Sequence, residues 1–239
     1  MGKTALVLGS SGGIGFEVCK KLILSGHTVI AQYQSNSQKV QDLYEYTERR
    51  DQLIPLQMDL TNSQQVDQVT SSLIQPDIFI HAGGHHYEGL FEETPDEEME
   101  KLWKVHLYQP GRMLRRLIPG MRRKQGASIV FVTSIWGETG ASYEVMYSAV
   151  KGAQISFVKA LGKELAPNGI RVNAVAPGAV STAMTAHYDE DVKAGIEDEI
   201  PAGRFARPEE IADAVVFLTG EQSTYIHAQV LSVNGGWYS

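Results

Sequence analysis

The chain has 239 residues, a net charge of −7 and 43% hydrophobic residues, enough apolar material for a sizeable core. This apolar content excludes an intrinsically disordered protein. Cys19 is the only cysteine, so an intrachain disulfide and a thiolate zinc site are excluded as well. The acidic balance argues against nucleic acid as the main partner. Because no bilayer-spanning apolar run and no targeting signal occur, we expect a cytoplasmic protein without a membrane partner.

Short apolar runs alternate with amphipathic stretches along the whole chain. The runs are rich in valine and isoleucine, as strands covered on both faces are, and span residues 4–8, 28–33, 53–58, 77–82, 128–133, 171–176 and 230–233. Helical patterns between them include 16–24, 66–73, 97–121 and 147–165, and Thr94, Pro95 and Glu97 predict a capping box before the third. The alternation predicts an α/β fold with a doubly wound, Rossmann-type, seven-stranded parallel sheet in a single domain, 1–239.

A glycine-rich turn links the first predicted strand to the first predicted helix. Glycines let the backbone approach a pyrophosphate closely, and the amides and dipole at a helix start favour the anion. The spacing Gly-x-x-x-Gly-x-Gly differs from the usual Rossmann spacing, and no P-loop lysine follows. The context predicts a dinucleotide site, with a purely structural turn as the alternative; its residues are Gly9, Ser10, Ser11, Gly13, Ile14 and Gly15.

The end of the second predicted strand bears on the choice of cofactor. A carboxylate there would bond the adenosine ribose and repel a 2′-phosphate, but none occurs before Asp42. The hydroxyl of Ser35 and the amide of Asn36 are suited to hold a phosphate instead. The sequence therefore favours NADP(H) as the cofactor.

Tyr147 and Lys151 lie four residues apart, on one face of a predicted helix. Such a pair is common by chance, but Ser134 ends the fifth predicted strand, at the edge where active sites of open α/β sheets gather. A ketone that accepts a hydride needs hydrogen-bond donors and a proton source. We expect Tyr147 to be the general acid, Lys151 to lower its pKa, and Ser134 to hold the carbonyl oxygen.

These motifs, in this order, resemble the short-chain dehydrogenase/reductase family over essentially the whole chain. Further matches are Asp59-Leu60 after the third strand and the run Asn173–Gly178. The resemblance implies that Asp59 bonds the adenine and that Val180 and Thr182 bind the nicotinamide amide. It adds further cofactor-binding residues: Leu60, Ala82, Gly83, Tyr147, Lys151, Pro177 and Gly178.

Two positions depart from the family pattern. His81-Ala82-Gly83-Gly84 replaces Asn-Asn-Ala-Gly, and His106 stands where the family has a catalytic asparagine. The resemblance implies that this asparagine acts through its backbone carbonyl, which holds a water of a proton relay, so His106 is a candidate for that backbone role. His81, His85 and His86 are considered as a metal site with Glu88, but we expect no metal and polar residues lining a pocket mouth.

The substrate is the least constrained inference. The overall pattern is similar to 3-oxoacyl-[acyl-carrier-protein] reductases, and residues 134–148 more closely resemble the bacterial branch that reduces a 5-aminopentanone group on a lysine of elongation factor P. An acidic segment follows Thr182, and such a field would attract a cationic amino-ketone. We expect a ketone substrate, carried in one interpretation on an acidic protein, and a homodimer or homotetramer. A non-catalytic NADP(H) sensor or scaffold is the alternative of another class; the candidate substrate contacts are His85, Trp136, Glu138 and Glu144.

Overall fold

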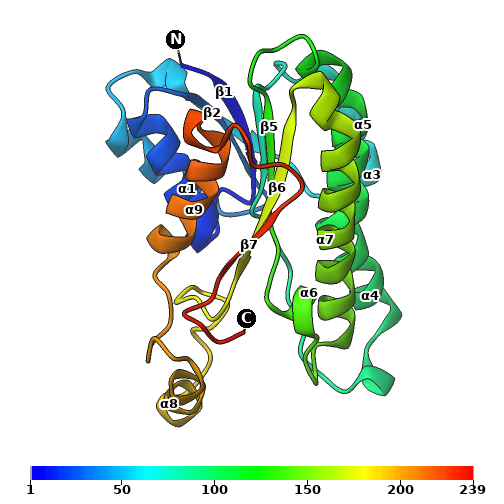
Figure 1. The fold of residues 1–239 in the computed structure, drawn as a ribbon, viewed down its shortest axis with the longest axis vertical. Helices are drawn as coiled ribbons and strands as arrows, with labels where there is room; N and C mark the ends of the chain where they lie inside the picture. The colour runs from blue at the N-terminus through cyan, green and yellow to red at the C-terminus, as the bar shows by residue number, and fades with distance from the viewer. Residues whose placement is uncertain (1, 239) are drawn as a thin grey trace.

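The computed structural model describes residues 2–238 and contains one parallel sheet (Figure 1). Its strand order is β3-β2-β1-β4-β5-β6-β7, which confirms the predicted doubly wound, seven-stranded sheet. Each predicted strand matches its observed bounds to within one residue at either end. The strands are β1 (Thr4–Leu8), β2 (Thr28–Tyr33), β3 (Leu53–Gln57), β4 (Ile78–His81), β5 (Ser128–Val132), β6 (Arg171–Pro177) and β7 (Val230–Val233).

Helices cover both faces of the sheet (Figure 1). One face carries α1 (Gly13–Leu24) and α9 (Pro208–Thr219), and the other carries α3 (Ser63–Ser72), α5 (Gln109–Met121) and α7 (Val145–Leu165). Successive side chains of a strand point to opposite faces, so β1 sends Ala5 and Val7 into one core and Leu6 and Leu8 into the other. Within residues 2–238 there is no helix whose length and apolar character would let it span a membrane.

The helix predicted over 97–121 is interrupted, which corrects the sequence interpretation. It consists of α4 (Asp96–Trp103), a π-helical turn (Lys104–Tyr108) and α5. Pro110 has no amide hydrogen to give to the carbonyl of His106 one turn earlier, and this carbonyl instead accepts a bond from the Gln154 side chain at 2.6 Å.

The predicted capping box at Thr94 is also wrong. The hydroxyl of Thr94 donates to the carbonyl of Leu90 at 3.2 Å, and Pro95 precedes α4 without a side-chain cap. Four α-helices of the described residues were not named from the sequence: α2 (Ser37–Gln41), α6 (Trp136–Thr139), α8 (Glu190–Glu199) and α9. Of these, α6 begins two residues after Ser134, and α8 lies beyond the carboxyl end of the sheet (Figure 1).

Candidate active site

A cleft of about 860 Å³ opens where the parallel strands end. Parallel strands present their carboxyl ends at one edge of a sheet, so turns that are distant in sequence meet there. The cleft is lined by most of the predicted cofactor-binding residues and by the whole predicted trio: Gly9, Ser11, Gly13, Ile14, Asp59, Leu60, Ala82, Gly83, Ser134, Tyr147, Lys151, Pro177, Gly178, Val180 and Thr182.

The glycine turn packs too tightly for side chains at two positions. Gly9 has a φ of +84°, and a Cβ there would come within 2.2 Å of the Gly83 backbone. A Cβ on Gly15 would come within 2.1 Å of the Gly9 carbonyl oxygen. The first turn of α1 contains no acidic residue, so the positive end of the helix dipole is not compensated there. The turn can therefore hold an anionic group such as a dinucleotide pyrophosphate.

Two predicted cofactor residues lie behind this turn, away from the cleft lining. The Ser10 hydroxyl donates to the Val7 carbonyl at 2.9 Å, and the Ser10 amide donates to the Gln32 carbonyl at 2.8 Å. Ser10 is fully buried, and Gly15 is buried against the Gly9 carbonyl. Both residues shape the turn through these contacts.

The end of β2 differs from the sequence prediction. Ser35 and Asn36 are exposed and do not line the cleft, and Asn36 caps α2 by accepting a bond from the Lys39 amide at 3.0 Å. Gln32 and Gln34 line the cleft in their place. The Gln32 side chain accepts from the Gly9 amide at 2.8 Å and donates to the Met58 carbonyl at 2.5 Å. A lone polar residue in an apolar strand was the signal that could have identified Gln32.

The structure brings Ser134, Tyr147 and Lys151 together. All three are buried. The Lys151 Nζ lies 5.4 Å from the centroid of the Tyr147 ring and donates to the Val132 carbonyl at 3.0 Å. The Ser134 hydroxyl is within hydrogen-bonding reach of Tyr147 and accepts a bond from the Trp136 amide at 3.2 Å. A phenol, a hydroxyl and an amine thus converge on one end of the cleft.

Burial controls the protonation of this group. It raises the pKa of Tyr147 above its ordinary value, the charge of Glu144 raises that pKa further, and the Ser134 hydrogen bond opposes both. Burial also lowers the pKa of Lys151 to about 7. The expectation that Lys151 lowers the pKa of Tyr147 is therefore not met: burial and the Glu144 charge act in the same direction, and they outweigh the Ser134 hydrogen bond. Tyr147 is a protonated donor at neutral pH.

The two histidines at the departing positions are fully buried. Burial, with a smaller contribution from the charge of Lys151, lowers the pKa of His81 to about 3 and that of His106 well below its usual range. Both rings are therefore neutral. The His106 Nε2 lies 2.7 Å from the His85 carbonyl oxygen, and the His106 carbonyl accepts the bond from Gln154. The predicted backbone role of His106 stays a prediction, with Gln154 as a neighbour that the sequence did not reveal.

The predicted substrate contacts divide into two groups. His85, Trp136 and Glu144 line the cleft. Glu138 does not: its carboxylate accepts bonds from the Ser232 hydroxyl at 2.9 and 3.0 Å, on the β7 side of α6. The expected contact of Glu138 with a substrate in the cleft is therefore not supported. Glu138 and Glu144 are six residues apart, but the first is directed toward β7 and the second toward the cleft.

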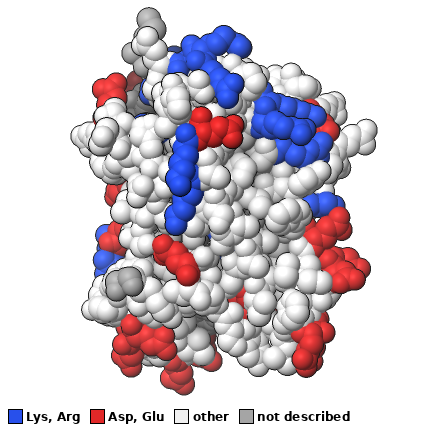
Figure 2. Space-filling view, turned by 45° about the vertical axis from the view of Figure 1, so that its right-hand side comes forward, with Lys and Arg blue, Asp and Glu red and all other residues white. Residues whose placement is uncertain are grey.

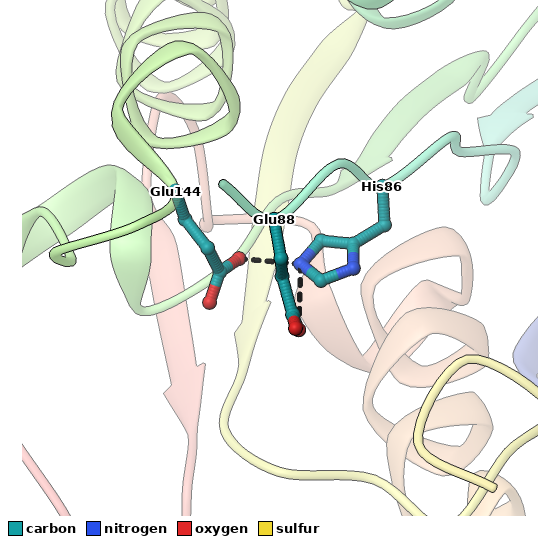
Figure 3. Close-up of side chains that lie close together, drawn as sticks. All are labelled: His86, Glu88 and Glu144. Carbon is teal, nitrogen blue, oxygen red and sulfur yellow. Dashed lines mark hydrogen bonds and ion pairs between the residues drawn. The ribbon is translucent and has the colours of Figure 1, made fainter. Parts of the chain in front are cut away.

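Figure 3 shows a second set of ligand-type side chains, one of which, His86, contacts the Tyr147 ring. His86, Glu88 and Glu144 each offer one donor atom, and these atoms all lie within 4.8 Å of one another. His85, in contrast, pairs with Glu98, and His81 is buried elsewhere. The sequence had grouped the three histidines, but the fold separates them.

Comparisons with known proteins extend over the whole chain. Residues 9–238 match the family model described as "Enoyl-(Acyl carrier protein) reductase". An uncharacterized oxidoreductase, YmfI, of Bacillus subtilis is 46% identical, with 100% of each chain covered. The 3-oxoacyl-[acyl-carrier-protein] reductase FabG of Aquifex aeolicus is 34% identical over 99% of this chain and 98% of its own. L-sorbose reductase of Gluconobacter frateurii, solved with NADPH and L-sorbose, is 29% identical with a TM-score of 0.89, covering 99% of this chain and 96% of its own.

Proposed function

The chain belongs to the short-chain dehydrogenase/reductase family of oxidoreductases, and from this premise we propose that it is an NADPH-dependent ketone reductase. The observation that carries the proposal is the single cleft in which the glycine turn meets Ser134, Tyr147 and Lys151. Cofactor binding alone, as in a sensor or a scaffold, needs no such trio.

In this proposal the amides of the turn after β1 hold the pyrophosphate, Asp59 bonds the adenine, and Val180 and Thr182 bind the nicotinamide amide. The preference for NADPH is supported by the lack of a carboxylate between Gln32 and Asn36. The solved L-sorbose reductase, similar in fold over nearly the whole chain, contains NADPH.

Cofactor choice is tested at Gln34, which lines the cleft, whereas the neighbouring Tyr33 packs against the core. We expect Gln34→Asp to weaken NADPH binding relative to NADH about tenfold, since a carboxylate beside the 2′-phosphate repels it. Calorimetric titration with both cofactors measures this ratio, and Gln34→Asn is the matched uncharged control. Equal NADPH and NADH affinities in the wild-type protein would contradict the proposed preference.

The chemistry follows from the protonation of the site. NADPH, when bound, supplies a hydride to the carbonyl carbon of the ketone. Tyr147, kept protonated by burial, gives its proton to the carbonyl oxygen as negative charge develops there. Ser134 bonds the same oxygen and orients it. Lys151 stabilises the phenolate that remains, and a pKa of about 7 lets it exchange a proton near neutral pH.

We further propose that the ketone is the 5-aminopentanone group on a lysine of elongation factor P. The resemblance of residues 134–148 to that branch supports this assignment, as does the Glu144 carboxylate in the cleft, which suits a cationic group. The alternative is a 3-oxoacyl-[acyl-carrier-protein] reductase, which is favoured by the activity named for the Aquifex aeolicus relative.

The experiment follows NADPH oxidation with two substrates: elongation factor P carrying the 5-aminopentanone group, and an acetoacetyl thioester of the acyl carrier protein. We expect a clearly higher kcat/KM for the first. Tyr147→Phe should lower kcat about a hundredfold or more on the better substrate and leave NADPH affinity little changed, as loss of a general acid does. Efficient reduction of the thioester alone would favour the alternative, and full activity of Tyr147→Phe would contradict the mechanism.

We also propose that the chain forms a homodimer or homotetramer. An apolar groove on the outer layer of α4, α5 and α7 supports this, with Trp103 and Tyr108 each 45% exposed. Arg115 and Glu164 lie on the same groove, so a two-fold-related copy can pair one with the other.

A further inference from the structure

The loop after β4 brings two ligand-type residues to the start of α7 (Figure 3). The His86 Nε2 lies 2.6 Å from a Glu144 carboxylate oxygen and 3.6 Å from a Glu88 carboxylate oxygen. The His86 ring stands edge-on to the Tyr147 ring, with centroids 5.0 Å apart. Two carboxylates therefore lie next to the residue that is proposed to protonate the ketone.

This cluster carries uncompensated negative charge. Among residues 2–238, no lysine or arginine lies within 4.0 Å of the carboxylate of Glu88 or Glu144; their ion-pair partners are His86 and, at 3.8 Å from Glu88, the exposed His187. The His86 imidazole, even when protonated, offsets only one of the two carboxylate charges. Glu98, in contrast, forms ion pairs with both His85 and Lys101, so its negative charge is compensated.

The cluster is also held in place before any ligand arrives. The buried His106 ring bonds the His85 backbone, and the Gly89 amide donates to the Tyr143 carbonyl at 2.8 Å, which ties the loop to the residue before Glu144. The Tyr188 hydroxyl donates to Glu88 at 2.8 Å. The side chains of His86 and Glu144 are only 14% and 12% exposed, so a group bound between them would be partly withdrawn from water. Charge-assisted hydrogen bonds are strong in such a setting.

We propose that Glu144 and Glu88 form a subsite for a protonated amine carried by the ketone substrate, and that the ammonium takes the place of His86 as the hydrogen-bond partner of Glu144. This inference rests on the proposed ketone reduction and adds the place where the positive charge of the substrate is bound. A bound ammonium would also offset the Glu144 charge that helps to raise the pKa of Tyr147, and would thereby make the phenol a better acid.

The test compares two ketones of matched shape, 5-(dimethylamino)pentan-2-one and 6-methylheptan-2-one. The first is cationic at neutral pH, and as a tertiary amine it cannot cyclise to a neutral imine; the second replaces the nitrogen by carbon. We expect the wild-type protein to reduce the amino-ketone with a kcat/KM about tenfold or more above that of its neutral counterpart, as one hydrogen bond between charged groups allows. The preference should shrink as salt is added.

Substitutions then assign the preference to the cluster. Glu144→Gln, and separately Glu88→Gln, should lower the ratio of the two kcat/KM values toward one, because the amino-ketone loses its charged partner and the neutral ketone has none to lose. Glu138→Gln is the matched control, since that carboxylate bonds Ser232 outside the cleft and should leave the ratio unchanged. Thermal unfolding of each variant checks that the fold is kept.

Three results would overturn the proposal. The first is a wild-type ratio near one, and the second is a ratio that neither glutamine variant changes. The third is a preference that a chelator abolishes and zinc restores, which would make the cluster a metal site. If neither ketone is reduced, the proposed function fails instead, and calorimetry with the NADPH-loaded protein decides the subsite: tighter binding of the amino-ketone that Glu144→Gln removes supports it, and equal binding overturns it.

Discussion

Lys151 shows most directly how burial shapes single residues of the site. A lysine in the unfolded chain has a pKa of 10.5, whereas burial in the folded protein lowers the pKa of Lys151 to about 7. Between these values the unfolded chain binds a proton that the folded chain has lost. The free energy of unfolding of the ligand-free protein therefore gains a contribution that rises with pH from about 7 to about 10.5. The buried amine therefore lowers the free energy of unfolding at neutral pH. A residue that destabilises the fold in this way is consistent with a role in function.

Replacing this amine should make the ligand-free protein more stable. We expect Lys151→Met, which keeps a similar volume, to raise the free energy of unfolding at pH 7 by about 1–4 kcal/mol. Loss of the hydrogen bond to the Val132 carbonyl, worth about 1 kcal/mol, acts in the opposite direction. Urea unfolding at pH 7 and pH 10 measures the difference, which should narrow at the higher pH. A difference that does not vary with pH would mean that Lys151 keeps an ordinary pKa.

Among the elements, the link between β1 and α1 depends most on close backbone contact. The carbonyl of Gly9 lies where a side chain of Gly15 would begin, so α1 can start this near the strand only with glycine at that position. The π-helical turn between α4 and α5 is a second such case, where Pro110 frees a carbonyl that another helix then binds. In the first case glycine lacks a Cβ, and in the second proline lacks an amide hydrogen. Each absence allows the local backbone geometry that the structure shows.

A matched pair of substitutions tests the first link. We expect Gly15→Ala to lower the free energy of unfolding by about 1–3 kcal/mol, because its Cβ would meet backbone that cannot move aside. Gly12→Ala is the control, since the nearest atom to its Cβ would be 3.4 Å away and its φ of −78° suits alanine. Denaturant unfolding compares the two. Equal stabilities would show that the turn adjusts freely.

At the scale of the whole molecule, the face shown in Figure 2 has an uneven distribution of charge. Most basic side chains of this face lie toward its upper end, where some carboxylates also lie, whereas its lower end carries carboxylates and no basic patch (Figure 2); Figure 1 shows α8 at this lower end, beyond the carboxyl end of the sheet. Carboxylates near the cleft favour a cationic group over an acidic carrier surface. The apolar groove along α4, α5 and α7 lies on the outer helical layer, and none of its lining residues also lines the cleft.

The assembly is tested on this groove. We expect sedimentation velocity to show a dimer or tetramer, and the double substitution Trp103→Glu with Tyr108→Glu to give a smaller species, since buried carboxylates without partners oppose association. Leu24→Glu is the control, because Leu24 is 64% exposed at the end of α1 on the other side of the sheet. A monomeric wild-type protein at micromolar concentration would contradict the proposed assembly.

The sequence by itself determined the strands, the family and the position of the glycine-rich turn, because these depend on neighbouring residues and fixed spacings. Apolar runs bounded by glycine, proline or asparagine identified each strand to within a residue. The spacing of Ser134, Tyr147 and Lys151 along a strand end and a helix predicted residues that the fold does bring into one cleft. Their catalytic roles stay predictions that the substitutions above test.

Only the tertiary structure decided what depends on groups that are distant in sequence. Gln32 joins Gly9 to Met58, and Gln154 takes the carbonyl that Pro110 leaves free. Glu138 and Glu144 lie six residues apart, yet one bonds β7 and the other lines the cleft. The protonation of Tyr147 likewise follows from burial among several elements, which no local pattern records. Polar contacts and pKa values are set by atoms a few ångströms away in space, and those neighbours exist only once the chain has folded.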